Sequence, residues 1–542
     1  MSTNPKRKQT IIGAGIVGAM EAYYAWKDAE EKGEQIRISI YDGHQTLAET
    51  TVQNIMPSLT IDEMMAVIPP APLLDAALEI PFNQPGGIRA SESISAKIKE
   101  SLSAQEFIRQ VKAYSKDPEG HAARTKSLFE LGRMSMDLWL EFYDKGDEEL
   151  KKIMQESNFN PCREPDSSVP VLHDGFRIDL LYNITDASKT AESWRKNYLQ
   201  QGYQSCRVLS PAEVKALDPQ LTKFCEEHKE DANTWKNDAV ALYRPGGCID
   251  TQVFLPKFYD YLTRKMGTYI NNSGDVKDCL RVKFNRRVIG VRYADERTML
   301  LDGLQFKEGG LKQNTHQYQD SQYIFCTGEA VDAFSNLGFA APAYAGFAGA
   351  SLMLDITIPE DQKASFVDFN HCMEVHQVGV CLAWQGRFRD NKIFIGVAGT
   401  KAFYGNLNPN VNDEFTLNRN LLQLNMINHV LPQFTSLALG TSTKGVVLDA
   451  TDLQTLEDAK IARRWAGVRA VAPDGYPTLG AVYTGNGQVA NARVTTHLGS
   501  GGVSMAHAAV LVSRCGLFKN TPMAKLPLIQ DVLEYSNSRR RF

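Results

Sequence analysis

The sequence has no paired pattern among its cysteines. Its nine cysteines are scattered over 542 residues, their number is odd, and none forms the C-x-x-C spacing of zinc and redox motifs. A disulfide framework and a zinc-ribbon site are therefore excluded as the organising feature of the fold. Scattered thiols of this kind are typical of a reducing compartment, so we predict a cytoplasmic protein and expect no metal site.

The chain also lacks a long apolar run and a marked excess of either charge. No stretch is long enough to span a bilayer, and the formal net charge of −4 gives no electrostatic basis for binding nucleic acid. Residues 1–8 are polar and basic, without the apolar core of a signal peptide. We therefore expect neither a membrane helix nor a nucleic-acid partner. The length predicts two or more structural units.

A glycine-rich motif near the N-terminus is the strongest local signal. The β-branched run at residues 10–12 leads into GAGIVG at residues 13–18, and a helical segment follows at once. Gly13 permits the tight turn, Gly15 lets the backbone approach a pyrophosphate, and Gly18 lets the helix pack on the strand. The first helical N–H groups and the helix dipole then face the phosphates. This strand–turn–helix context predicts a dinucleotide-binding site.

A second predicted strand supports this site. Residues 36–41 form a β-branched run that ends at Asp42, where a carboxylate can accept a hydrogen bond from a ribose 2′-hydroxyl. The following loop, residues 48–57, contains Thr51 and Asn54, whose polar side chains offer hydrogen bonds near a bound cofactor. On these loop residues alone, a plain turn is an equal interpretation.

Further glycines recur towards the C-terminus. A buried-type strand over residues 321–328 stops at Gly328, where the missing side chain lets a cofactor pass. Residues 465–480 contain a Pro-Asp-Gly turn before a short strand, and residues 496–502 place a glycine cluster before an alanine-rich helix. Backbone N–H groups at such a helix start can face the electron-rich edge of a reduced flavin and favour its reduction.

Taken in order, these blocks resemble the D-amino-acid oxidase type of FAD-dependent oxidoreductases, the family that includes glycine and sarcosine oxidases and D-amino-acid dehydrogenases. The blocks are GAGIVG with Asp42, the strand ending at Gly328, Gly467-x-Arg469 running into Pro473-Asp474-Gly475, and His497 to Gly502 before the last helix. They span nearly the whole chain. The first block is shared by many FAD and NAD proteins, and the last two blocks narrow the resemblance to this family.

The resemblance implies FAD as the cofactor, and no cysteine or histidine signal for covalent attachment is present. The N-terminal glycines and Asp42 would hold the ADP half, and Val288 would offer its backbone to the adenine. Gly328 would pass near the pyrophosphate or the ribityl chain, and the glycines after His497 would sit by the isoalloxazine ring. The predicted cofactor-binding set is Gly13, Gly15, Ile16, Val17, Gly18, Asp42, Thr51, Asn54, Val288, Gly328, Gly499, Ser500, Gly501, Gly502 and Val503.

Arg469 matches the arginine that grips a substrate carboxylate in many members of this family. A guanidinium binds a carboxylate bidentately, so Arg469 would hold a small amino acid, N-alkyl amino acid or 2-hydroxy acid while hydride passes to flavin N5. Tyr404 and His497 are predicted to lie on the catalytic side as well. A structural ion pair for Arg469 and packing roles for the other two are alternative interpretations. The electron acceptor, oxygen or a quinone, stays open, as does the oligomeric state.

The resemblance also implies the fold class. We expect an α/β chain, α+β overall, with a Rossmann-like FAD-binding domain assembled from discontinuous segments and an antiparallel-sheet substrate domain. Residues 8–70, 240–335 and 440–520 are assigned to the FAD-binding domain. Residues 75–235 are assigned to a helical insertion or cap, and residues 340–435 to the substrate domain.

Three other classes compete with this interpretation. An FAD monooxygenase shares the first block but usually carries a Gly-Asp segment before its last FAD-contacting helix, where this chain has LGSGG at residues 498–502. An NAD-dependent dehydrogenase would not explain the C-terminal blocks. A non-catalytic flavoprotein interaction module is left open by Met56, which stands where the family's loop carries a glycine.

Overall fold

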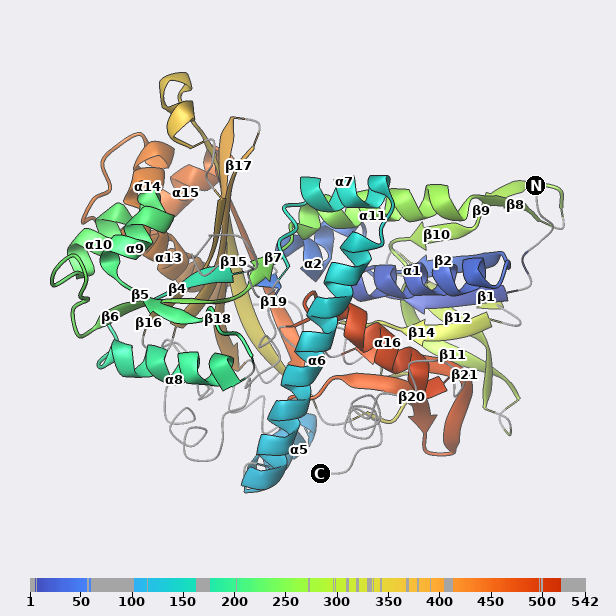
Figure 1. Cartoon of the computed structure of the whole chain (residues 1–542). Coiled ribbons are helices and arrows are strands. Elements are labelled where there is room, and N and C mark those ends of the chain that lie inside the picture. The colour runs from blue at the N-terminus through green and yellow to red at the C-terminus, as the bar shows by residue number, and fades with distance from the viewer. Residues whose placement is uncertain are drawn as a thin grey trace.

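A six-stranded sheet forms one half of the molecule, an eight-stranded sheet forms the other, and helix α6 crosses between them (Figure 1). The computed structural model describes residues 5, 7–55, 58–59, 102–114, 116–161, 176–200, 202–271, 273–295, 297, 299–308, 311–317, 321–328, 334, 336–341, 344–366, 370–377, 380–389, 391–403, 413–496, 498 and 501–517.

The six-stranded sheet has the order β10-β2-β1-β14-β21-β20. Its strands are β1 Arg7–Ile12, β2 Ile36–Tyr41, β10 Leu280–Lys283, β14 Ser321–Phe325, β20 Thr478–Thr484 and β21 Gly487–Thr496. All neighbours pair in parallel except β20, which is antiparallel to β21. Segments from three distant parts of the chain therefore share one sheet, and the carboxyl ends of β1, β2 and β14 meet at the same edge.

The eight-stranded sheet has the order β19-β15-β18-β17-β16-β4-β6-β5. Its strands are β4 Phe176–Tyr182, β5 Arg207–Leu209, β6 Ala239–Pro245, β15 Ala345–Thr357, β16 Asn370–Gln377, β17 Val380–Arg389, β18 Lys392–Phe403 and β19 Ala462–Val471. Neighbours pair antiparallel, except that β16 and β4 run parallel. The chain passes from edge strand β19 to β20 of the other sheet through the short link at residues 472–477.

Smaller strand pairs complete the sheet structure. A three-stranded sheet β11-β12-β13 follows β10 in the chain, and two short pairs join β3 to β7 and β8 to β9. The bounds are β3 Ser58–Leu59, β7 Gly247–Cys248, β8 Thr268–Ile270, β9 Val276–Asp278, β11 Arg287–Asp295, β12 Leu300–Glu308 and β13 Leu311–Gln317.

Helices cover both sheets. Helices α1, α11 and α16 lie with the six-stranded sheet, and α8 to α10 and α13 to α15 lie with the eight-stranded sheet (Figure 1). The described helices are α1 Ile16–Glu31, α2 Thr51–Asn54, α5 Leu102–Tyr114, α6 Pro118–Asp144, α7 Glu148–Glu156, α8 Ala187–Gln200, α9 Pro211–Leu217, α10 Thr222–His228, α11 Thr251–Met266, α13 Asp413–Val430, α14 Pro432–Leu439, α15 Ala450–Asp458 and α16 Ala506–Leu517, with 3₁₀ turns η1 Leu47–Glu49, η2 Pro219–Leu221 and η3 Glu360–Ser365.

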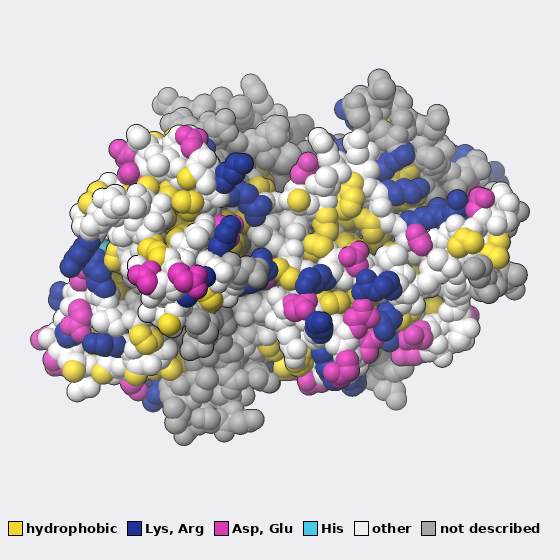
Figure 2. Space-filling model, turned by 90° about the horizontal axis from the view of Figure 1, so that it is seen from above, with side chains coloured by type: hydrophobic (Ala, Val, Ile, Leu, Met, Phe, Trp, Pro, Cys, Tyr) yellow, Lys and Arg dark blue, Asp and Glu magenta, His cyan; other side chains and the backbone are white. Residues whose placement is uncertain are grey.

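The packing follows the sequence pattern. The β-branched runs of β1 and β2 place Ile11, Ile38 and Ile40 at zero exposure in the main core, as expected for strands covered on both faces. Charged side chains of both signs are interspersed over the face seen in Figure 2, in keeping with the formal net charge of −4. Within the described ranges, no helix combines the length and the apolar character needed to cross a bilayer.

The mixed α/β fold class predicted from the sequence is confirmed. The predicted domain boundaries stay a prediction. The sheet to which some strands belong differs from the domain to which we assigned their segments. Strands β4 and β5 lie within residues 75–235, which we expected to be a helical insertion, and β6 and β19 pair in the eight-stranded sheet although we grouped their segments with the FAD-binding domain. The reason is physical. The fully buried β6 run pairs with β4, a partner about sixty residues earlier that no local pattern identifies.

Candidate cofactor and substrate site

The turn after β1 is built on two glycines that admit no side chain. Gly13 has φ +111°, and a Cβ there would come closer than 3.0 Å to the carbonyl oxygen of Cys326, just beyond β14. A Cβ at Gly18 would overlap the carbonyl oxygen of Gly13 in the same way. The start of α1 therefore packs directly on the end of β1, as the glycine pattern predicted.

Gly15 and Gly328 border open space instead. No described atom lies within 4 Å of a Cβ built at either position, and Gly328 is exposed with φ +55°. Gly15 is the N-cap of α1, and no described side chain caps this helix. Free N–H groups at a helix start favour an anion. The edge where β1 and β14 end thus has the room and the polarity that a pyrophosphate requires.

Asp42 forms the next part of the site, at the end of β2. Its Oδ2 accepts the N–H of Ala14 at 2.7 Å, and its Oδ1 accepts the N–H and Nδ1 of His44 at 2.9 and 2.7 Å. Burial alone would raise the pKa of Asp42, but the hydrogen bonds from His44 and Ala14 outweigh it and lower the pKa. A carboxylate accepts about four hydrogen bonds, so Asp42 is an ionised acceptor with capacity left for a ribose hydroxyl.

Helix α2 carries Thr51 and Asn54, the two loop residues predicted to bind the cofactor, and the two side chains differ in their hydrogen bonds. The Oγ1 of Thr51 is buried and has no hydrogen-bond partner among the described residues, so its hydrogen-bonding capacity is unmet within them. The side-chain amide of Asn54 instead donates to the carbonyls of Ala48 and Thr50 at 2.8 and 3.0 Å. Thr51 therefore fits a cofactor contact, whereas Asn54 holds the loop.

Val288 lies beside the Asp42 end of β2. It belongs to β11, is 6% exposed, and packs in one apolar cluster with Ile12 and Tyr41. Two residues earlier, the N–H of Arg286 donates to the carbonyl of Asp42 at 2.7 Å. The structure thus brings Val288 close to the strand end where the adenine side of FAD was predicted.

The glycine cluster before α16 is described in part. His497, Gly499 and Ser500 lie outside the described residues, as does Tyr404. Gly501 is buried, its N–H donates to the carbonyl of Leu498 at 3.0 Å, and a Cβ at Gly502 would meet no described atom within 4 Å. Among the described residues, Gly502 therefore leaves open space just before the helix.

Helix α6 fixes this same turn, which the sequence did not reveal. The hydroxyl of Ser135 donates to the carbonyl of Ser504 at 2.5 Å and accepts the N–H of Ala508 at 3.4 Å. Trp139 Nε1 donates to the carbonyl of Val503 at 3.3 Å. A hydroxyl from another helix thus acts as a cap for the first turn of α16.

Arg469 lies on the edge strand of the eight-stranded sheet, and the register defines its face. Directly paired residues share a face, and one unbroken row crosses six strands. The row runs Asp179–Glu374–Ala383–Ala398–Ser351–Trp465. Arg469 follows Trp465 by four residues on the same strand, so it points to the same side of the sheet. We call this side the Arg469 face.

Two paired glycines form a floor under the side chains of this face. Gly349 of β15 pairs with Gly467 of β19. A Cβ at Gly349 would overlap Nη1 of Arg469, and a Cβ at Gly467 would overlap the six-membered ring of Trp465. The guanidinium and the indole therefore lie side by side over backbone. The sequence analysis named Gly467 only as part of the block that ends at Arg469, and it did not identify Gly349 or a contact of Trp465, although a glycine inside a strand is a known signal of close approach.

Ser351 is the point at which α2 contacts the Arg469 face. Its hydroxyl donates to the carbonyl of Asn54 at 2.6 Å, joining α2 to the Arg469 face. On the far side of α2, Gln53 Nε2 donates to the carbonyl of Thr251 at 2.5 Å, and Thr251 Oγ1 donates to the carbonyl of Val52 at 2.6 Å. Helix α2 is thus held between the start of α11 and the sheet that carries Arg469.

Comparison with known proteins gives matches over nearly the whole chain. A family model described as FAD dependent oxidoreductase (DAO) matches residues 9–514. Similar solved structures include L-proline dehydrogenase from P. horikoshii (14% identity, TM-score 0.53, covering 99% of this chain and 98% of that one). Glycine oxidase from Bacillus cereus ATCC 14579 (12%, 0.52, 99% and 99%) and iminodiacetate oxidase from Chelativorans sp. BNC1 (15%, 0.51, 98% and 98%) are similar too. A search of curated proteins gave no match.

Proposed function

The chain belongs to the FAD-dependent oxidoreductase family, matched over residues 9–514, and on that basis we propose that it oxidises a small amino or N-alkyl amino acid. The single observation that carries this proposal is Arg469, a cation over the glycine floor on the sheet face that Ser351 joins to α2. FAD supplies the oxidised ring that accepts a hydride from the substrate. A 2-hydroxy acid is the remaining candidate substrate.

The chain's own residues provide the binding and positioning. We infer that Gly15 and Gly328 leave room for the pyrophosphate, that Asp42 accepts a ribose hydroxyl, and that Thr51 donates its hydroxyl to the cofactor. The turn at Gly501 and Gly502, held by α6, would face the ring. Each of these residues would meet the cofactor through open space or through a polar atom without a partner among the described residues.

Arg469 would act on the substrate by fixing its carboxylate. A bidentate guanidinium–carboxylate pair sets both position and orientation, and a well-oriented reactant loses much of the entropic barrier. The indole of Trp465, beside the guanidinium, would exclude water from this pair and strengthen it.

The choice between an amine and an alcohol rests on chemistry and on the relatives. An amine that enters neutral needs no strong base, whereas an alcohol requires one close to its hydroxyl. Three similar structures are named for acting on proline, glycine and iminodiacetate, each of which carries both a nitrogen and a carboxylate. Both points favour an amino acid or N-alkyl amino acid as the substrate class.

We expect Arg469→Ala to weaken this substrate strongly. Truncating one partner of a buried charged pair costs about 2–5 kcal/mol, so kcat/KM should fall roughly 30-fold to several-thousand-fold. Gly349→Ala should act on the same step, because its Cβ displaces the guanidinium. A misplacement of about 1 Å can cost about a hundredfold. Steady-state kinetics of FAD-loaded variants measures both effects.

Gly485→Ala is the matched control for this pair. Gly485 lies in the turn between β20 and β21, and a Cβ there meets no described atom within 4 Å. It should keep wild-type kinetics, and all three variants should retain FAD. Unchanged KM and kcat in Arg469→Ala would overturn the carboxylate role.

A further inference from the structure

A second cluster of potential ligands lies away from the Arg469 face. His228 ends α10, Glu227 precedes it, and His429 is in the last turn of α13. His429 stacks on Tyr182 of β4, with ring centroids 4.9 Å apart and the planes 24° from parallel. Tyr182 is three residues from Asp179 of the Arg469 face, so this cluster lies on the opposite side of the eight-stranded sheet.

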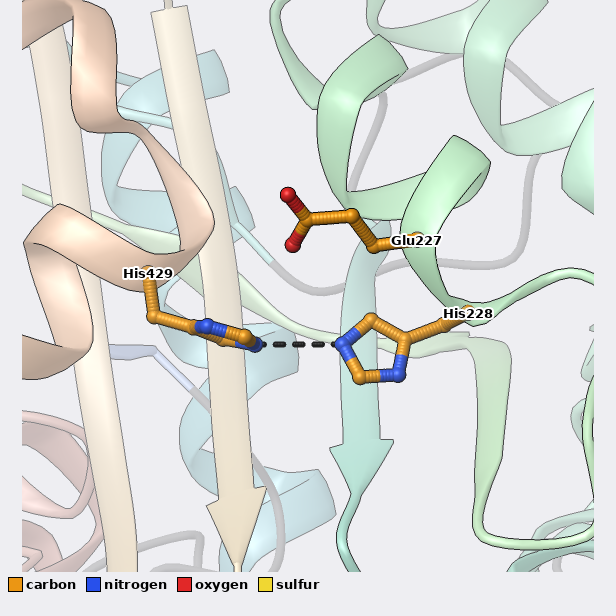
Figure 3. Close-up of side chains that lie close together, drawn as sticks. All are labelled: Glu227, His228 and His429. Atoms are coloured by element: carbon orange, nitrogen blue, oxygen red, sulfur yellow. Dashed lines mark hydrogen bonds between the residues drawn. The ribbon is translucent and has the colours of Figure 1, made fainter. Parts of the chain in front are cut away.

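The donor atoms of the cluster converge. Nε2 of His228 and Nε2 of His429 are 3.1 Å apart, and one carboxylate oxygen of Glu227 completes a set whose atoms all lie within 4.8 Å of one another. Figure 3 shows the two imidazoles, carried by different helices, meeting nitrogen to nitrogen with their planes steeply inclined, and the Glu227 carboxylate beside their contact. No sequence spacing predicted this set, because the histidines are 201 residues apart.

Both imidazoles are suited to bind a cation. Burial lowers the pKa of His228, with His429 adding to the effect, and burial likewise lowers the pKa of His429. Both rings are therefore neutral near pH 7, and neutral imidazole is the form that ligates metals. The neighbouring charged groups are mixed. Lys223 lies 3.5 Å from Glu227, and Lys236 and Asp238 also act on His228.

We propose that Glu227, His228 and His429 form a binding site for a zinc-class divalent cation that joins α10 to α13. Zinc–nitrogen bonds of about 2.0–2.1 Å at a tetrahedral angle place two nitrogens about 3.3 Å apart, close to the 3.1 Å between the two Nε2 atoms. Each ring turns slightly so that its lone pair leaves the N···N line and points to the side of the Glu227 carboxylate. Water takes the fourth position, because Glu227 and His429 are partly exposed.

A second cluster of similar composition is less suited to bind a cation because of the charges around it. Asp179, Glu374 and His376 also lie within 4.8 Å of one another. Their carboxylates are already bound by two guanidinium groups, with Arg177 and Arg244 at 2.8 and 2.7 Å from Glu374. A cation there would meet two fixed positive charges. The set of Glu227, His228 and His429 faces Lys223 and Lys236 instead, and the carboxylate of Asp238 offsets part of their charge.

Zinc titration of the tag-free, FAD-loaded protein by calorimetry tests the site. We expect one zinc per chain, with His228→Gln and His429→Gln each abolishing the binding. Glu227→Gln should weaken it at least tenfold. Glu226→Gln is the matched control, since Glu226 is next in the helix and pairs with Lys215 and Lys229 instead; it should bind zinc like the wild type.

The thermal stability of the wild type gives a second measurement, which depends neither on the folding of variants nor on enzyme turnover. Because the cation would bind the folded chain alone, zinc should raise the Tm of the wild type by several degrees, reversibly on adding EDTA. Lys223→Gln should tighten zinc binding, since it releases the Glu227 carboxylate. No stoichiometric zinc binding by the wild type, or equal binding by folded His429→Gln, would overturn the proposal.

Discussion

Gly13→Ala is expected to leave the protein unable to retain FAD and markedly less stable. A side chain at φ +111° is strained, and its Cβ would overlap the carbonyl oxygen of Cys326, which belongs to backbone and cannot turn away. Strain and overpacking together cost about 3 kcal/mol or more. Relief requires β1 and β14 to separate at the edge where the pyrophosphate would lie.

Gly15→Ala should separate the loss of FAD binding from the loss of stability. A Cβ at Gly15 meets no described atom within 4 Å, and its backbone has an ordinary φ of −71°. The apoprotein should therefore unfold within about 0.5 kcal/mol of the wild type, while FAD affinity falls at least tenfold because the methyl group occupies the space left for the phosphates. Urea unfolding of the apoproteins and FAD titration of each variant measure the two effects. Equal FAD affinity in Gly15→Ala and wild type would contradict the assignment of this edge.

Arg493→Met is expected to destabilise the fold by about 3–5 kcal/mol, the cost of leaving a buried charge unpaired. Arg493 on β21 binds Glu21 on α1 through its two Nη atoms, with Nη1 to Oε1 at 2.6 Å, and the two side chains are 1% and 0% exposed. Thr495 Oγ1 also donates to Glu21 at 2.9 Å. This pair fixes the helix that starts at Gly15 against the strand that leads to the C-terminal glycines, so FAD retention should fall as well.

A double-mutant cycle isolates the pair. Glu21→Met should be as damaging as Arg493→Met, whereas the double variant should recover most of the loss, because an apolar pair of similar volume leaves no charge unsatisfied. Glu31→Gln, an exposed position on the same helix, should stay within about 0.5 kcal/mol of the wild type. Additive losses in the double variant would show that the two residues act separately.

The sequence predicted those parts of the site whose determinants are adjacent in the chain. Gly13, Gly18 and Asp42 belong to one strand–helix–strand unit, so their spacing alone predicted the tight turn and the acid beside it. The overlaps at both glycines and the hydrogen bond from Ala14 to Asp42 agree with that pattern. Residues close together in the sequence were sufficient to predict the geometry of these three positions.

The parts that the sequence did not reveal depend on register between distant segments. Gly349 and Gly467 are paired only because β15 and β19 align, and Ser135 reaches α16 across more than 350 residues. The cofactor contact of Asn54 stays a prediction, because the amide nitrogen of this polar loop residue donates to two carbonyls of its own loop. Side-chain hydrogen bonds that close a loop compete with those to a ligand, and sequence alone does not rank them.

The most direct test of the central claim is an anaerobic titration of the FAD-loaded protein, followed by its visible spectrum. The panel comprises D- and L-amino acids, N-alkyl amino acids, 2-hydroxy acids and the matching amines without a carboxylate. We predict that an amino or N-alkyl amino acid bleaches the flavin band, that the matching amine does not, and that Arg469→Ala needs at least about 30-fold more substrate. Readmitting air then shows whether oxygen is an acceptor. If dithionite bleaches the band but no member of the panel does, or if the amines bleach it as readily as the acids, the proposed carboxylate-directed oxidation is contradicted.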